Sequence, residues 1–184
     1  LEPGNALVLA GTRLPLTAWQ VDTGYRRMDP ASDPVYTVEG DGHVEEGVFT
    51  AGSGVPTTKV GSAQALITGR SGELTGRAQI TVIRDPDQVS LEQGETGLPV
   101  NVLALQPGES VSLRASARWR NLDLLSQNDC YTWTCDPAVG TVTPDGVFTA
   151  GETMTEGELT VTAGTASLTI PVKITGHILG LEDF

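Results

Sequence analysis

The hexapeptide Gly47-Val48-Phe49-Thr50-Ala51-Gly52 occurs a second time, 99 residues later, as Gly146-Val147-Phe148-Thr149-Ala150-Gly151. Six identical residues in a row indicate a duplicated structural unit. Upstream, Tyr36-Thr37-Val38 is matched by Tyr131-Thr132-Trp133 after 95 residues. Because the offset drifts slowly along the chain, the two copies differ mainly in loop length, as homologous β units do. We therefore expect two tandem units of roughly 90 residues, each near the usual size of a domain.

Shorter matches extend the duplication to both sides. They are Pro3, Asn5, Leu7 and Leu9 with Pro99, Asn101, Leu103 and Leu105; Leu14, Leu16 and Ala18 with Val111, Leu113 and Ala115; Ile67-Thr68 with Val161-Thr162; and Ile80 and Val82 with Ile170 and Val172. A further strand is predicted at Val89–Leu91. When the two copies are aligned on these matches, no segment of the first copy corresponds to that strand, because the alignment starts at Leu1.

Every matched segment is short, alternates apolar with polar residues and is bounded by Gly, Pro or Asp. This pattern predicts strands with one face on a core and one in water. No stretch of ten residues has helical periodicity, and Asn121–Gln127 could form one turn at most. Several short strands with regular turns favour an antiparallel β-sandwich in each unit. We expect the aromatic residues shared by the two copies, Tyr36, Phe49, Tyr131 and Phe148, to belong to the cores.

We place the first sandwich at residues 1–85 and the second at 86–176. The junction is expected at Arg84-Asp85-Pro86-Asp87, and residues 177–184 would be a tail or the start of a further domain. The sequence starts at Leu1 with neither a Met nor a signal peptide, so we interpret it as part of a longer chain.

Composition excludes several classes of protein. The 22 Gly and 11 Pro are 33 of 184 residues, and charged residues are 18%, which excludes a coiled coil and a charge-rich disordered tail. A formal net charge of −12, with Lys59 and Lys173 as the only lysines, argues against a nucleic-acid partner. No apolar run approaches the ~20 residues of a membrane span, so no membrane insertion is expected.

The repeated motifs resemble bacterial immunoglobulin-like domains of the group 2 type. The resemblance rests on Tyr131-Thr132-Trp133, Gly140-Thr141-Val142, Gly146–Gly151 and Val161-Thr162-Ala163, with matching segments in the first unit. It implies tandem immunoglobulin-like sandwiches from a bacterial extracellular or cell-surface protein. The chain is also similar, less specifically, to the regions that follow the catalytic domain of secreted phosphodiester glycosidases. This second similarity rests on the tandem units and the segment Glu182-Asp183-Phe184 that follows them.

Reactive residues are sparse. The two histidines, His43 and His177, lie in no nucleophile motif, and no Gly-x-Ser-x-Gly turn occurs. We therefore expect no catalytic residue and no enzyme activity in this chain. The predicted function is a non-catalytic spacer whose partners are the neighbouring domains of the parent protein. The alternatives are an adhesin-like or carbohydrate-binding module and an accessory region of a glycosidase.

Two kinds of ligand site stay open. Calcium prefers oxygen ligands from loop aspartates, and Asp29 with Asp33 or Asp85 with Asp87 could supply them, although Asp-Pro steps also form turns without metal. No other cofactor is expected.

A surface or cell-wall glycan could stack on aromatic residues outside the repeated framework, Trp19, Tyr25 and Trp119.

Cys130 and Cys135 are five residues apart and have no counterparts in the first unit. In a strand their Cα atoms would be ~16 Å apart, beyond the reach of a disulfide. They are expected to be free thiols unless a bulged loop brings them together.

Overall fold

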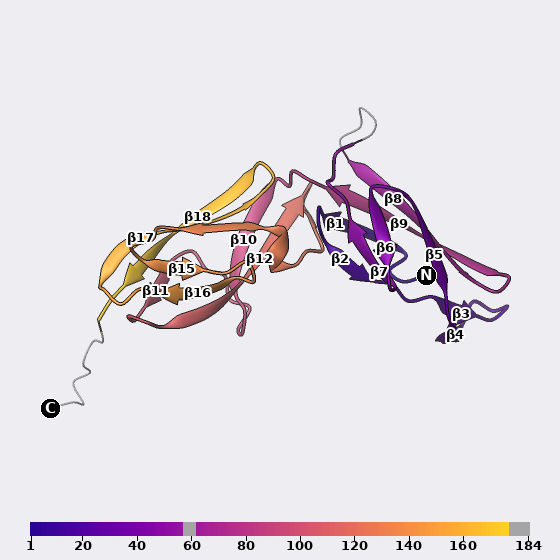
Figure 1. Ribbon diagram of the computed structural model, residues 1–184, viewed down its shortest axis with the longest axis horizontal. Coiled ribbons are helices and arrows are strands. Elements are labelled where there is room, and N and C mark those ends of the chain that lie inside the picture. The colour runs from indigo at the N-terminus through magenta and orange to yellow at the C-terminus, as the bar shows by residue number, and fades with distance from the viewer. Residues whose placement is uncertain (57–61, 177–184) are drawn as a thin grey trace.

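The computed structural model describes residues 1–56 and 62–176, which form two β-sandwiches arranged end to end (Figure 1). The first sandwich contains β1 (Asn5–Leu9), β2 (Arg13–Pro15), β3 (Trp19–Val21), β4 (Arg27–Pro30), β5 (Val35–Gly40), β6 (Gly42–Glu45), β7 (Val48–Ala51), β8 (Ala63–Ser71) and β9 (Leu74–Ile83). The second contains β10 (Gln88–Gln93), β11 (Leu103–Leu105), β12 (Ser110–Trp119), β13 (Leu122–Asp123), β14 (Thr132–Cys135), β15 (Gly140–Val142), β16 (Val147–Ala150), β17 (Thr155–Ala163) and β18 (Ala166–Ile174).

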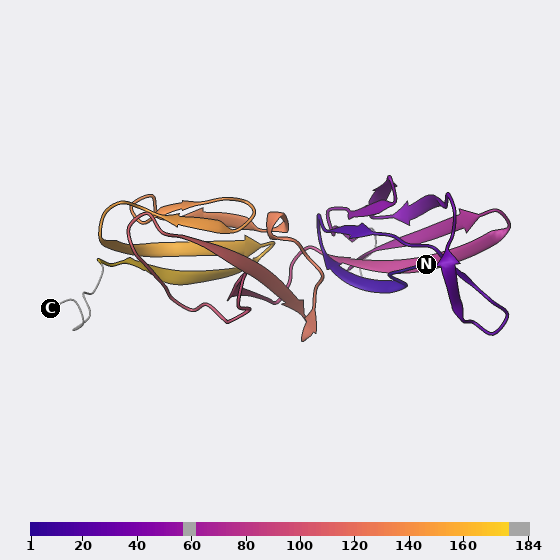
Figure 2. The same cartoon turned by 90° about the horizontal axis from the view of Figure 1, so that it is seen from below.

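Each sandwich has two layers, which Figure 2 shows edge-on for the second one. In the first sandwich, the sheet β1-β9-β8-β5 belongs to one layer and the sheet β2-β7-β6 to the other, and β3 and β4 form a separate hairpin. In the second sandwich the corresponding sheets are β11-β18-β17-β14 and β10-β12-β16-β15, with β13 added to the end of β12. The prediction of two tandem immunoglobulin-like β-sandwiches is confirmed.

The repeated hexapeptides form equivalent central strands, β7 and β16. Phe49 and Phe148 are completely buried. Phe49 pairs with Leu14 of β2, and Phe148 pairs with Val111 of β12. The preceding repeated glycines, Gly42 and Gly140, have φ values of +151° and +147°. A Cβ atom on either would clash with the backbone of β7 or β16 or with the buried phenylalanine ring. Close packing against the phenylalanine therefore explains why glycine occurs at this position twice.

Two strand pairs depart from the antiparallel pattern. β1 runs parallel to β9, and β11 runs parallel to β18. β1 and β11 are also the edge strands of their sheets.

The predicted match of Leu7 and Leu9 with Leu103 and Leu105 is wrong by one residue. Val8 pairs with Val82, as Leu103 pairs with Val172, and these are the positions that face the two cores. Leu7 and Leu9 point to the opposite face of β1, because side chains alternate along a strand. They are apolar for a different reason, which is their contact with the second sandwich.

The strand Val89–Leu91 also has a partial counterpart, contrary to the alignment. Glu2 pairs with Thr17 in the antiparallel sense, as Glu92 pairs with Arg114. Glu92 lies 90 residues after Glu2, whereas Leu103 lies 95 residues after Val8. The second sandwich therefore has five extra residues between these strands.

Among the described residues a helical turn, of the 3-10 type, lies at Asn128–Cys130 and not at Asn121–Gln127, part of which forms β13. Cys130 and Cys135 are free thiols and half-buried. Burial, with Asp136 nearby, raises the pKa of the Cys135 thiol, which disfavours its reactive thiolate form.

Candidate functional site at the joint between the sandwiches

The four candidate calcium ligands are not brought together into one site. Asp29 lies exposed in β4, and Asp33 lies exposed in the following turn. Asp85 lies beside Arg84, with Nε to Oδ2 at 3.7 Å, and a carboxylate oxygen of Asp87 accepts a hydrogen bond from the backbone N–H of Arg120. Within residues 1–56 and 62–176, no three His, Cys, Asp or Glu side chains are arranged to hold a metal ion.

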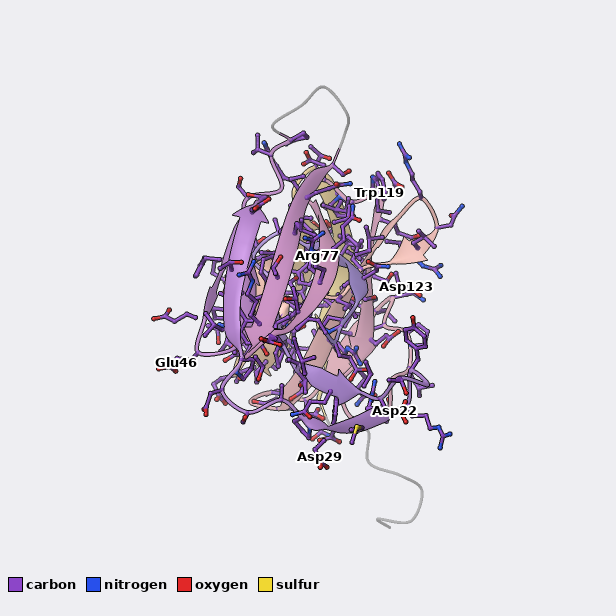
Figure 3. The ribbon with its side chains drawn as sticks, turned by 90° about the vertical axis from the view of Figure 1, so that its right-hand side faces the viewer. Asp22, Asp29, Glu46, Arg77, Trp119 and Asp123 are labelled. Atoms are coloured by element: carbon purple, nitrogen blue, oxygen red, sulfur yellow. The ribbon has the colours of Figure 1, made fainter. Side chains whose placement is uncertain are left out.

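The aromatic candidates lie at two separate places. Trp19 and Tyr25 belong to the β3–β4 hairpin, at the end of the first sandwich that is remote from the second (Figure 1). Trp119 ends β12, and Figure 3 shows it well apart from Asp22 and Asp29 of that hairpin. These residues therefore form no shared aromatic surface.

Trp19 and Trp119 are each stacked against an arginine. The Arg27 guanidinium lies 4.6 Å from the centroid of the Trp19 ring, and that of Arg120 lies 4.3 Å from the Trp119 ring. Trp19 Nε1 and Arg27 also donate hydrogen bonds of 2.7 Å to Glu2. These hydrogen bonds, chiefly that from Arg27, lower the pKa of Glu2. One face of each indole is consequently occupied by a cation from the same chain.

Tyr25 has no such contact and is 89% exposed at the hairpin tip. His43 is exposed on β6, and His177 lies outside the described residues.

A set of hydrogen bonds and apolar contacts joins residues more than 100 positions apart at the joint between the sandwiches. The segment Leu124–Cys130 of the second sandwich contacts β1 through Leu125 and contacts Thr12 and Arg13 through its later residues. Leu125 forms a parallel bridge with Val8, its N–H donates to the Leu7 carbonyl at 2.9 Å, and its carbonyl accepts from the Leu9 N–H at 3.0 Å. The second sandwich thus adds one residue of strand to a sheet of the first, which satisfies backbone groups of an otherwise open edge.

Side chains extend this contact to Arg13, the first residue of β2. The Gln127 amide oxygen accepts from the Arg13 N–H at 3.0 Å, and its amide nitrogen donates to the Arg13 carbonyl at 2.9 Å. The Arg13 guanidinium forms an ion pair with Asp129. Because this ion pair is exposed, we assign it to orientation more than to stability.

Thr12 is fully buried at the centre of the joint. Its hydroxyl donates to the Leu125 carbonyl at 3.0 Å and lies 3.7 Å from the Cys130 sulfur. A buried hydroxyl has to form a hydrogen bond to offset its desolvation, so Thr12 fixes where the Leu125 carbonyl lies.

Two side chains of the first sandwich belong to the hydrophobic core of the second. Leu9 and Ile83 are each 2% exposed, and both pack in the cluster that contains Val89, Leu91 and Phe148. Apolar burial of this kind contributes ~25 cal/mol per Å² and is lost if the sandwiches separate.

The segment that carries Leu125 is itself anchored by Asn128. Its amide nitrogen donates to the carbonyls of Leu113 at 2.7 Å and Asp145 at 2.6 Å, and its amide oxygen accepts from the Ala115 N–H at 2.9 Å. Asn128 therefore connects the docking segment to β12 and to the turn before β16.

The sequence patterns described above do not predict this joint, although one signal for it exists. Leu7-Val8-Leu9 is a continuous apolar run, and such a run is typical of a strand covered on both faces. Nothing comparable marks Thr12, Gln127 or Leu125.

The part of the chain that the structure describes contains no helix with the length and apolar character of a membrane span. No family model matches the chain, and no curated protein matches it either. The group 2 assignment and the glycosidase context therefore stay predictions.

Several solved structures match the chain over most of its length. They include the S-layer protein rSbsC(31-844), at 15% identity, TM-score 0.38, and coverage of 94% of this chain and 26% of that one. The adhesin InvE of Yersinia pseudotuberculosis has 13% identity, TM-score 0.37, and coverage of 95% and 57%. Human protocadherin-24 EC1-2 has 11% identity, TM-score 0.29, and coverage of 95% and 97%. The chain thus spans about a quarter of the S-layer structure, and these similarities are too low to carry a conclusion about function.

Proposed function

We propose that this chain is a stiff, non-catalytic spacer within a larger bacterial protein that is secreted or displayed on the cell surface. The proposal rests on the packing and hydrogen bonding at the joint between the two sandwiches. Leu9 and Ile83 are buried in the core of the second sandwich, and Leu125 continues the sheet edge of the first. A pair of domains on a flexible tether would leave these groups in water, whereas here rotation between the sandwiches costs buried area and hydrogen bonds.

The linker supports the same function. It is four residues long, and within it Pro86 is buried. The backbone N–H of Asp87 donates to the Arg118 carbonyl at 2.8 Å, and its carboxylate holds the Arg120 turn. A short linker that is bonded to the next domain limits bending further.

Small-angle X-ray scattering of the whole chain tests the proposal. We expect one extended conformation with a maximum dimension of roughly 70–90 Å, as two sandwiches placed end to end would give. A compact globule, or a profile that fits only freely hinged domains, would contradict a stiff spacer.

A matched pair of variants tests whether the joint causes the stiffness. Leu9→Asp places a charge in the shared core, and we expect a broadened distribution of end-to-end distances. Ala104→Asp introduces the same charge at an exposed position of β11, and we expect the scattering profile of the wild-type chain.

A second candidate function is adhesion or glycan binding through the β3–β4 hairpin. Tyr25 is 89% exposed at its tip, and Val21 and Met28 on the same hairpin are 56% and 54% exposed. The Asp22 carboxylate orders the tip by accepting from the N–H groups of Gly24 and Arg26 at 2.8 and 2.9 Å. A glycan array with wild type and Tyr25→Ala tests this function, and signals that do not differ between them would rule the hairpin out.

A further inference from the structure

The surface of the second sandwich that corresponds to the joint surface of the first is uncovered. By the register of the parallel pairs, β11 takes the place of β1, with Leu103 at the position of Val8. Val102 and Ala104 then correspond to Leu7 and Leu9. Leu9 is 2% exposed in the joint, whereas Val102 is 52% exposed and Ala104 is also exposed.

Backbone groups on this edge are open as well. The Leu105 carbonyl accepts from Thr175 beside β18, so the groups of Ala104 point to the other side, as those of Leu9 do. In the described part of the chain, the Ala104 N–H and the Val102 carbonyl have no partner across the outer edge of β11, where their counterparts bond Leu125.

A groove of about 580 Å³ lies beside this edge. The inserted residues before β11 form one wall, including Leu98 and Val100, and the start of β12 forms the other, including Val111. Leu98 is 61% exposed, so the wall presents apolar surface to water. We refer to the outer edge of β11 and this cavity together as the β11 groove.

The charge on the β11 groove differs from that on the first joint. The charged residues among those that line it are Glu95 and Glu109, both acidic. Glu109 occupies the position of Thr12, and Ser110 that of Arg13, which pairs with Asp129 in the existing joint. An acidic residue placed like Asp129 would be repelled here, whereas a basic one would be attracted.

We propose that the β11 groove binds the next β-sandwich of the parent chain, through an extended apolar segment that pairs with β11 and carries a basic residue facing Glu109. The inference rests on the proposed spacer function, since it places a joint of the same kind one domain further along, with Lys173 where the existing joint has Ile83. It uses the same strand addition that Leu125 makes on β1. The five-residue insertion widens the contact by adding Leu98 and Val100 to the docking surface.

A three-sandwich chain tests the proposal. Residues 1–174 are followed directly by a second copy of residues 85–176, so that Ile174 takes the place of Arg84. One version keeps Asp129 in the added copy, and the other carries Asp129→Lys there. The readout is hydrogen exchange at the Ala104 amide, compared with the same amide in the original chain.

We expect exchange at Ala104 to slow by about tenfold or more in the Asp129→Lys version and by less in the unmodified one, because a docked strand protects the amide. In the Asp129→Lys version, a further Val102→Asp substitution in the original second sandwich should restore fast exchange at its Ala104 amide. Ala104 exchanging at the original rate in both versions would overturn the proposal, provided that core amides of the added copy, such as that of Val161, are protected.

This outcome is independent of the test of the spacer function. Scattering of the two-sandwich chain can show a stiff joint while the Ala104 amide stays unprotected, in which case the β11 groove proposal alone fails.

Discussion

The backbone N–H of Leu9 donates a 3.0 Å hydrogen bond to the carbonyl of Leu125, 116 positions later in the chain. This bond joins a strand of the first sandwich to a loop of the second, and the Thr12 hydroxyl donates to the same carbonyl. The two sandwiches are therefore connected by specific hydrogen bonds as well as by their linker.

Thr12 should be essential to that contact. Thr12→Val keeps the shape of the side chain but removes the buried hydroxyl, and we expect a loss of about 1–2 kcal/mol in the free energy of unfolding. Urea denaturation measures it. Thr12→Ser, which keeps the hydroxyl, should retain the hydrogen bond and lose less. Equal losses in both variants would show that packing, and not the hydrogen bond, is what Thr12 supplies.

Asn128 should be the most sensitive asparagine of the second sandwich. Asn128→Ala leaves the Leu113 and Asp145 carbonyls and the Ala115 N–H without their side-chain partner, and we expect a loss of about 2–3 kcal/mol. The exposed Asn101 is the matched control, and Asn101→Ala should change stability by less than about 0.5 kcal/mol. Thermal or urea melts that give similar values for the two variants would contradict the anchoring role.

The repeated glycines should tolerate no side chain. Gly42→Ala and Gly140→Ala each place a Cβ against β7 or β16 at a positive φ, and we expect each to destabilise its own sandwich by about 1–3 kcal/mol. Gly4→Ala is the control, because the nearest atom to its added Cβ would be the Leu1 carbonyl oxygen at 3.7 Å. Wild-type melting of both repeated-glycine variants would refute the packing explanation.

Alkaline pH should weaken the fold through Tyr131. Burial raises the pKa of Tyr131 to about 12 from its ordinary value of 10, although the hydrogen bond with Ser126 opposes this shift. The folded chain therefore holds this proton more tightly than the unfolded chain does. Its contribution is complete below pH 10 and is lost as the pH rises towards 12, by up to about 1.4 kcal/mol per pH unit.

Tyr131→Phe checks that assignment. The variant should lose some stability at pH 7, where its hydroxyl bonds Ser126, but its stability should fall less steeply between pH 10 and 12. Tyr25→Phe, at the exposed hairpin tip, should keep the wild-type pH dependence. If both variants follow the wild-type curve, the alkaline loss comes from other groups.

Calcium should leave the melting temperature unchanged. Asp29 and Asp33 are exposed, and Asp85 and Asp87 already have partners within the chain. A ligand that binds the folded state must raise stability by mass action, so melts in EDTA and in excess Ca²⁺ should coincide. A calcium-dependent rise would instead show that the folded chain binds calcium.

The sequence by itself determined the fold class, the duplication and most of the core. The alternation around Phe49 and Phe148 specifies strands with one buried face, and the repeated Gly42 and Gly140 mark where the chain passes against those rings. Such features depend on local periodicity and on steric limits on the backbone. Both can be recognised from the order of apolar residues and glycines along the sequence.

Only the tertiary structure decided what Leu7, Leu9 and Leu125 do. A sequence comparison of the two copies aligned Leu9 with Leu105, because both are apolar, but the strand register turns Leu9 towards the other sandwich. The joint depends on backbone hydrogen bonds and on one buried hydroxyl between segments more than 100 residues apart. Backbone groups are the same in every residue, so no pattern of side chains records which of them will pair.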